Sequence, residues 1–73
     1  MKRHDLVFVN GAGLRALRLA QGLRQADLAV LAGIDTSYLS MLETGRRPRA
    51  SAGVAAELAR ALAVDLPSII VKK

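Results

Sequence analysis

The sequence predicts an all-α fold, a compact bundle of about five short helices, and three observations lead to this prediction. Apolar residues make up 52% of the 73-residue chain but aromatic residues only 3%, and alanine and leucine dominate, which favours closely packed helices over strands. Apolar residues also recur at helical spacing, and capping residues and glycines separate the segments. A chain this short holds one core. We therefore expect one domain over 10–71, an N-terminal arm over 1–9 and a basic tail at 72–73.

The start of the chain is expected to be an arm that leads into the first helix. Residues 1–9 (MKRHDLVFV) carry basic residues and then a β-branched and aromatic run that is too short and too isolated to make a sheet. Asn10 can cap a helix over about 11–21, and Gly22 ends its apolar pattern. The fragment GAG at 11–13 lacks the lysine and further glycines of a phosphate loop, so we interpret it as the flexible opening of this helix.

Two short helices joined by a tight turn are expected next. The second helix should cover about 25–32, and Gly33 stands where a left-handed residue would end it. Asp35 is suited to cap the third helix, which should end near Gly45. The buried stripe of the second helix is Leu28, Ala29 and Ala32, and that of the third is Leu39 and Leu42.

The C-terminal half is expected to hold a loop and two more helical segments. The run RRPRA at 46–50 should be a loop, because proline and clustered arginines resist helix continuation. Ser51 can cap a fourth helix, and Asp65 with Pro67 should start a last short helical turn. The inward side of the fourth helix is expected to be Val54, Ala55, Leu58 and Leu62.

The second and third helices meet the requirements of a helix-turn-helix. Two helices that cross steeply through a short turn need a small residue where they approach, a glycine at the turn and aliphatic residues that hold the second helix in place. Ala29 supplies the first and Gly33 the second. Leu39 and Leu42 supply the third, and all four are assigned structural roles.

The segment QADLAVLAGIDTSYLSMLETGRR resembles the DNA-binding domain of the Cro and phage-repressor type, also called the xenobiotic-response-element helix-turn-helix family. LRALRLAQGLRQADLA is similar to the first two helices of that family, and AAELARALAVDLPSII to its fourth and fifth. The resemblance implies a lambda-repressor-like fold, and a structural ion pair between Arg18 and Glu43. It also implies sequence-specific binding to double-stranded DNA by a transcriptional regulator, with a repressor favoured over an activator.

The outward face of the third helix is the candidate base-reading surface. If Leu39 and Leu42 are buried, the side chains that turn outward are Thr36, Ser37, Ser40, Met41 and Thr44. Short side chains let a helix sit deep in the major groove, and hydroxyls can bond base edges. Periodicity alone favours simple solvation of an exposed helix. The resemblance instead implies base contacts at Thr36, Ser37, Ser40 and Met41.

A second set of residues is expected to hold the phosphate backbone. Gln25 begins the second helix, where free amides favour a phosphate, and the resemblance implies that contact. Arg24 stands where the family usually has a capping serine or threonine, so it loses a cap worth about 1 kcal/mol and adds a charge. Tyr38 is either a core-edge residue or a phosphate contact. The remaining expected phosphate contacts are Thr44, Arg46, Arg47 and Arg49.

Composition supports a polyanion partner and argues against other classes. The net charge is +5, and eight of the eleven basic residues are arginine, whose planar side chain suits phosphates and guanine edges. The only histidine, His4, lies in the arm, so we expect no enzyme, no metal site and no cofactor. No apolar run is long enough to span a membrane or serve as a secretory signal, so the protein is expected in the cytoplasm, at the nucleoid.

A protein-interaction module is the alternative function. Leu19, Val30 and Leu31 fall outside the main core stripes of the first two helices. With the C-terminal residues Ile69, Ile70 and Val71 they could form a homodimer face or the docking surface of an antitoxin or other partner-binding subunit, provided that they are contiguous. DNA binding and such docking can coexist.

Overall fold

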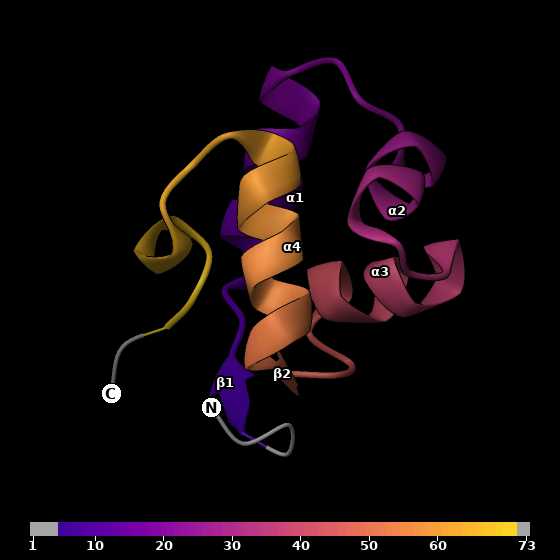
Figure 1. Cartoon of the computed structure of the whole chain (residues 1–73). Helices are drawn as coiled ribbons and strands as arrows, with labels where there is room; N and C mark the ends of the chain where they lie inside the picture. Colours follow the sequence, from indigo (N-terminus) through magenta and orange to yellow (C-terminus); the bar gives the residue numbers. More distant parts are fainter. Residues whose placement is uncertain (1–4, 72–73) are drawn as a thin grey trace.

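The computed structural model describes residues 5–71, so the first four residues of the expected arm and the expected basic tail at 72–73 lie outside the described residues. Four α-helices surround one core, and two short strands lie together at one end of the molecule (Figure 1). The elements in chain order are β1 (Leu6–Phe8), α1 (Gly11–Ala20), α2 (Gln25–Ala32), α3 (Thr36–Thr44), β2 (Arg49–Ser51), α4 (Ala52–Leu62) and a 3₁₀ turn, η1 (Leu66–Ser68).

The helix boundaries follow the capping signals of the sequence. The side chain of Asn10 accepts a hydrogen bond of 3.0 Å from the amide of Gly13, and Ser51 accepts one of 3.1 Å from Val54, so both predicted caps are confirmed. Gly33 ends α2 with a positive φ of 73°, a backbone conformation that glycine adopts without strain. Asp35 occupies the N-cap position of α3, but its exposed side chain makes no capping hydrogen bond, so that prediction is wrong in detail.

The small sheet corrects the prediction of an all-α fold. β1 pairs antiparallel with β2, with Val7 opposite Ala50, and Val9 forms an isolated antiparallel bridge with Ile70. The run at 6–9 is therefore not isolated, because the chain brings partners to both sides of it. The segment 46–50 was expected to be a loop, but its last two residues belong to β2 because they pair with β1. Pro48 still takes part, because its carbonyl oxygen accepts a 2.9 Å hydrogen bond from the amide of Val9.

The C-terminal segment forms the short helical turn that was expected after Asp65, but this turn is a 3₁₀ turn and not a fifth α-helix. It forms only the 3₁₀ turn η1, in which Pro67 lacks the amide hydrogen that a longer helix would use. Ile69, expected on an interaction face, is fully buried, and Ile70 is half-buried against the core, so only Val71 of the three is exposed. Their burial follows from the strand-like bridge that ties the C-terminal segment to Val9.

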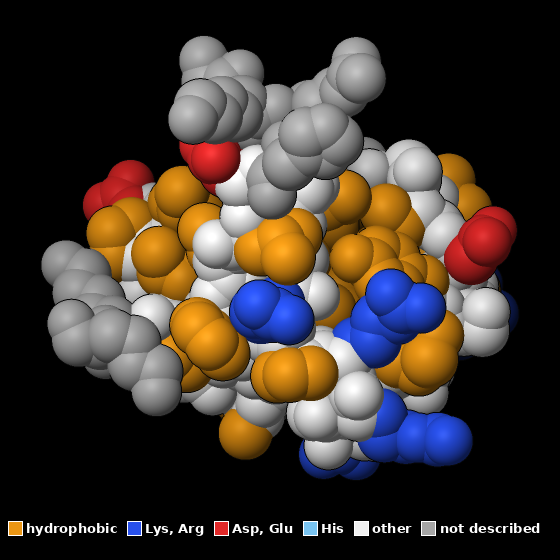
Figure 2. Space-filling view, turned by 90° about the horizontal axis from the view of Figure 1, so that it is seen from below, with side chains coloured by type: hydrophobic (Ala, Val, Ile, Leu, Met, Phe, Trp, Pro, Cys, Tyr) orange, Lys and Arg blue, Asp and Glu red, His pale blue; other side chains and the backbone are white. Residues whose placement is uncertain are grey.

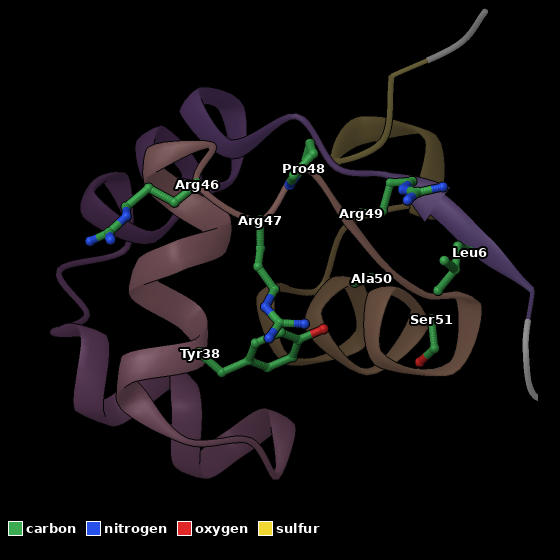
Figure 3. A pocket seen from close by; sticks show the side chains of 8 residues that line it. All are labelled: Leu6, Tyr38, Arg46, Arg47, Pro48, Arg49, Ala50 and Ser51. Carbon is green, nitrogen blue, oxygen red and sulfur yellow. The ribbon is translucent and has the colours of Figure 1, made fainter.

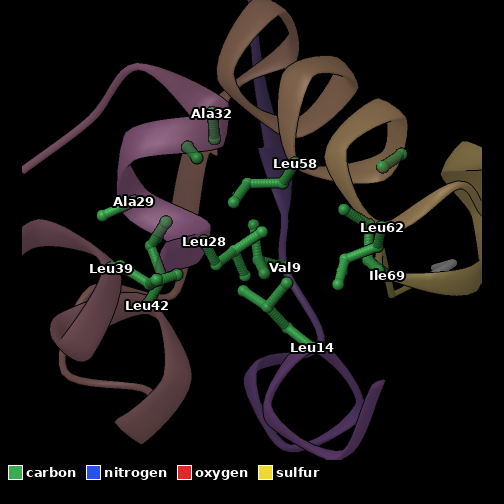
Figure 4. Close-up of a cluster of buried hydrophobic side chains, with 12 residues drawn as sticks. Val9, Leu14, Leu28, Ala29, Ala32, Leu39, Leu42, Leu58, Leu62 and Ile69 are labelled. Atoms are coloured by element: carbon green, nitrogen blue, oxygen red, sulfur yellow. The ribbon is translucent and has the colours of Figure 1, made fainter. Parts of the chain in front are cut away.

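The core lies where α1, α2, α3 and α4 meet (Figure 4). Its largest fully buried side chains are Leu14, Leu28, Leu39, Leu42, Leu58, Leu62 and Ile69. Burying each such side chain stabilises the fold by about 1.5–3 kcal/mol. Ala29 and Ala32 on α2 are also buried and let the helices approach closely. This core fixes α3 with one side buried and the other exposed at the edge of the molecule (Figure 1).

Candidate nucleic-acid interface

The exposed face of α3 begins with two hydroxyl side chains. Leu39 and Leu42 are fully buried, and Thr36 and Ser37 are exposed. Ser40 and Met41 are half-buried and lie on the same side of the helix. The four side chains expected to contact bases therefore lie on one side of α3, with Thr36 and Ser37 the most accessible.

Thr44 at the end of α3 is exposed, but its hydroxyl is bonded to its own helix. Its Oγ1 donates to the carbonyl oxygen of Ser40 at 3.0 Å, and lies 3.4 Å from that of Met41. A hydroxyl has one proton, and a phosphate oxygen needs a donor. In this conformation Thr44 has no proton left for a phosphate, which weakens the case for the contact expected there.

The start of α2 carries a local ion pair, between Arg24 and Asp27, that was not among the expected contacts. Asp27 accepts hydrogen bonds from the backbone amide of Arg24 at 2.8 Å and from its guanidinium at 2.9 and 3.1 Å. Those side-chain bonds, then the backbone bond, hold the pKa of Asp27 below its usual value. The side chain of Asp27 thus accepts a hydrogen bond from the amide of the N-cap residue Arg24, which is one of the two hydrogen bonds of a capping box. The guanidinium of Arg24 stays exposed beside the helix start.

A buried ion pair joins α1 to α3. Arg18 Nε donates to Glu43 Oε2 at 2.7 Å, and Arg18 Nη2 donates to Glu43 Oε1 at 2.9 Å, a bidentate arrangement. Arg18 Nη1 also donates to the carbonyl oxygen of Leu23 at 2.8 Å, in the turn before α2. The side chain of Glu43 is fully buried and that of Arg18 is 7% exposed. The pair therefore fixes the relative positions of α1, α3 and the start of α2.

Gln25 belongs to the same network. Its side-chain amide nitrogen donates to Glu43 Oε1 at 3.0 Å, and the residue is half-buried. Burial acts to raise the pKa of the Glu43 carboxyl, but the hydrogen bonds from Arg18 and Gln25 outweigh it and hold that pKa below its usual value. Gln25, which was expected to contact a phosphate, is thus bonded to Glu43, which was expected to have a structural role.

A shallow pocket of about 310 Å³ lies between α3 and the strand β2 (Figure 3). Arg46, Arg47 and Arg49 line it together with Tyr38. The guanidinium of Arg47 lies over the ring of Tyr38, 5.7 Å from its centre, and that of Arg49 lies 5.8 Å from the ring centre of Phe8. Within residues 5–71, none of these three arginines forms an ion pair with a carboxylate.

Tyr38 lies at the edge of the core, which is one of the two alternatives that the sequence left open. Its ring packs against the core and carries Arg47, while its hydroxyl points into the pocket (Figure 3). Arginine side chains lie toward the middle and one edge of the face that Figure 2 shows, and side chains of Asp and Glu lie at its margins. Among the described residues, the three arginines that line the pocket therefore present positive charge that is not paired with a carboxylate.

Other kinds of site find no support in the described part of the chain. Residues 5–71 contain no group of three or more His, Cys, Asp or Glu side chains that could hold a metal ion. None of the helices in this range is long and apolar enough to cross a bilayer.

The buried small residue on α2, the left-handed glycine at the turn and the outward polar face of α3 define a helix-turn-helix domain. A family model described as a helix-turn-helix domain matches residues 11–68, and the chain belongs to that family. The resemblance to the Cro and phage-repressor type is confirmed by this match and by similar solved structures. A search of curated protein sequences gave no match.

Solved structures of three regulators are similar to this chain. The restriction-modification controller protein C.AhdI from Aeromonas hydrophila is 41% identical, with a TM-score of 0.76 over 80% of this chain and 86% of that one. SinR from Bacillus subtilis, a master regulator for biofilm formation solved in complex with DNA, is 26% identical, with a TM-score of 0.76 over 80% and 95%. The clp gene regulator ClgR from Corynebacterium glutamicum is 33% identical, with a TM-score of 0.71 over 78% and 73%.

Proposed function

We propose that this protein binds double-stranded DNA in a sequence-specific manner and represses transcription, with α3 inserted into the major groove. The observation that carries the proposal is the accessible polar face of α3 next to three arginines that have no carboxylate partner within residues 5–71. Short hydroxyl side chains suit base edges, and free guanidinium groups suit phosphates. The similarity to SinR, which was solved in complex with DNA, supports the same function.

The interface divides into residues that read bases and residues that hold the backbone. Thr36 and Ser37 contact base edges, and the half-buried Ser40 and Met41 contribute from the same side of α3. Gln25 and Arg24 hold a phosphate at the start of α2, where backbone amides are also free. Arg46, Arg47, Arg49 and the hydroxyl of Tyr38 hold phosphates on the other side of α3. Each arginine contact then adds close to one unit to the dependence of binding on salt.

A binding experiment tests this function. A preferred site is first selected from random duplexes, and its affinity is then measured for the wild type and for the double variant Gln25→Ala with Ser37→Ala. We expect the double variant to bind at least about tenfold more weakly, since it loses a phosphate contact and a base contact. Ser68→Ala, a substitution on the exposed turn η1, is the matched control and should bind like the wild type. Equal affinity in all three proteins would contradict the proposal for this face.

A protein-interaction surface on α1 and α2 is a second candidate function. Leu19, Val30 and Leu31 are all exposed, with Val30 exposed by 79%. Apolar exposure of this kind is common at oligomer and partner interfaces, and SinR has been solved in a complex with the SinI protein. A homodimer formed here would favour a nearly palindromic site with half-sites about one helical turn, roughly 34 Å, apart. Sedimentation equilibrium of the wild type and of Leu31→Ser tests this, since a monomer in both cases argues against a dimer.

A further inference from the structure

The buried ion pair between α1 and α3 is bonded to a partly exposed side chain, that of Gln25. Glu43 Oε1 accepts hydrogen bonds from two groups at once, Arg18 Nη2 at 2.9 Å and Gln25 Nε2 at 3.0 Å. Glu43 has no exposed side-chain surface, whereas Gln25 is half-buried. The carboxylate therefore holds a side chain that is still accessible at the start of α2.

The geometry of the amide determines what Gln25 can still bind. A primary amide carries two N–H groups that diverge in one plane, and a carboxylate oxygen binds one of them. With one N–H on Glu43, the second points away from the carboxylate and remains available as a donor. The backbone amides of the first turn of α2 lie beside it and lack partners within the helix. The second N–H of Gln25 and these backbone amides can therefore donate to the same anionic oxygen.

Charge balance makes the arrangement suitable for a phosphate. An unpaired Glu43 carboxylate near the start of α2 would repel a phosphate. Both of its oxygens are instead bonded to Arg18, so the pair is neutral overall while it still accepts a hydrogen bond from Gln25. The network can thus orient a donor toward the phosphate without presenting a negative charge to it.

We propose that Glu43 is a positioning residue for DNA binding, which holds the Gln25 amide in the orientation that donates to a backbone phosphate. This inference rests on the proposed DNA-binding function and adds to it a role for the buried ion pair beyond stability. A glutamine side chain that is free in solution loses rotamer freedom when it binds, and a side chain already held by Glu43 loses less. The gain in affinity comes from this preorganisation.

The test replaces the ion pair without disturbing the packing. The variant Arg18→Met with Glu43→Leu puts apolar side chains of similar size at both positions, a change that proteins often tolerate. It leaves Gln25 in place but removes the carboxylate that orients it. The matched control is Arg60→Met with Glu57→Leu, which removes an exposed pair on α4 and changes the net charge equally. Because Arg18 also bonds the Leu23 carbonyl, thermal unfolding is measured first and binding is measured well below the melting temperature.

The decisive measurement is a cycle with Gln25→Ala. We expect Gln25→Ala and the Arg18→Met, Glu43→Leu variant each to weaken binding to the selected duplex by about tenfold. Combining them should weaken it little further, because both changes remove the same phosphate contact. The control pair should bind like the wild type. An unchanged affinity in the Arg18→Met, Glu43→Leu variant, or a loss that adds fully to that of Gln25→Ala, overturns the proposal while leaving DNA binding intact.

A second measurement uses only the wild-type protein, in case the paired variant does not fold. The side-chain amide protons of Gln25 are followed by NMR in the free protein and after addition of the duplex. We expect slow exchange with water in the free state and contacts to Glu43 that persist when DNA is bound. Loss of the Gln25 to Glu43 contact in the complex overturns the proposal. Absence of any DNA binding by the wild type instead overturns the proposed function itself.

Discussion

Gly11 and Leu42 are in backbone contact, because a β-carbon added at Gly11 would overlap the carbonyl oxygen of Leu42 and lie 2.8 Å from that of Glu43. The first turn of α1 therefore packs directly on the backbone at the end of α3. The fragment GAG at 11–13 was expected to be the flexible opening of α1, and for Gly11 that expectation is wrong. The glycine is needed for close approach, since any side chain there would push α3 away from α1.

Substitution of Gly11 should therefore destabilise the fold. The backbone of α3 cannot move aside as a flexible side chain would, so we expect Gly11→Ala to lower the free energy of unfolding by about 2 kcal/mol or more, as overpacking does. Urea unfolding followed by circular dichroism measures this. The control is Gly53→Ala in the first turn of α4, where the nearest atom to an added β-carbon is Ser51 Oγ at 3.9 Å. That change should be neutral or slightly stabilising. Equal stability of the two variants would exclude the close contact at Gly11.

Replacement of Ala63, at the end of α4, by glycine should increase the stability of the fold. It has a φ of 57°, and among residues 5–71 it is the one residue other than glycine with a positive φ. Since a β-carbon disfavours that conformation, we expect Ala63→Gly to raise the melting temperature, with a gain of up to about 1 kcal/mol. The same substitution at Ala56, exposed within α4, should cost about 1 kcal/mol. A loss of stability at both positions would show that the left-handed conformation carries little strain.

The sequence predicted the helices well because their signals are local. Asn10, Ser51 and Gly33 act on neighbours within a few residues, so their effects can be recognised without knowledge of the fold. The sheet could not be predicted in this way. β1 and β2 have three residues each, which is too short to show the alternation of polar and apolar residues that identifies a strand. Three helices also separate the two strands in the sequence, so their pairing is not a local feature.

The candidate site shows the same contrast between local and distant contacts. The outward face of α3 follows from the spacing of Leu39 and Leu42, so its members could be predicted. The bond between Gln25 and Glu43 depends on the angle between α2 and α3, which periodicity does not specify. The stacking of Arg47 on Tyr38 likewise depends on the path of the loop after α3.

Stability should fall in acid because of Glu43. Its pKa is lower in the folded protein than in the unfolded chain, so the unfolded state binds more protons as the pH falls. The stabilisation from its hydrogen bonds is therefore complete above the unfolded pKa of about 4.5 and is lost as the pH falls through the lower folded value. Urea unfolding between pH 7 and pH 3 should show this for the wild type. The variant Glu43→Gln cannot ionise at this position. It should be less stable than the wild type at pH 7, and its free energy of unfolding should fall less between pH 7 and pH 3. Parallel curves for the two proteins would exclude Glu43 as a source of the acid sensitivity.

Arg47 and Ser37 should affect DNA binding in different ways. Arg47 is stacked on Tyr38 and has no carboxylate partner among residues 5–71, so Arg47→Ala should weaken binding to all duplexes similarly and reduce the salt dependence by about one unit. Ser37 is exposed on α3, so Ser37→Ala should change the preference among duplexes and leave the salt dependence unchanged.

Affinity measured against salt for several duplexes separates these two effects. Arg60→Ala removes the same charge as Arg47→Ala, but Arg60 is already paired with Glu57 on α4, so this control should keep nearly the full salt dependence. If Arg60→Ala reduced it as much as Arg47→Ala, overall charge and not a local phosphate contact would govern binding. A uniform loss over all duplexes for both Arg47→Ala and Ser37→Ala would contradict the division into residues that hold the backbone and residues that read bases.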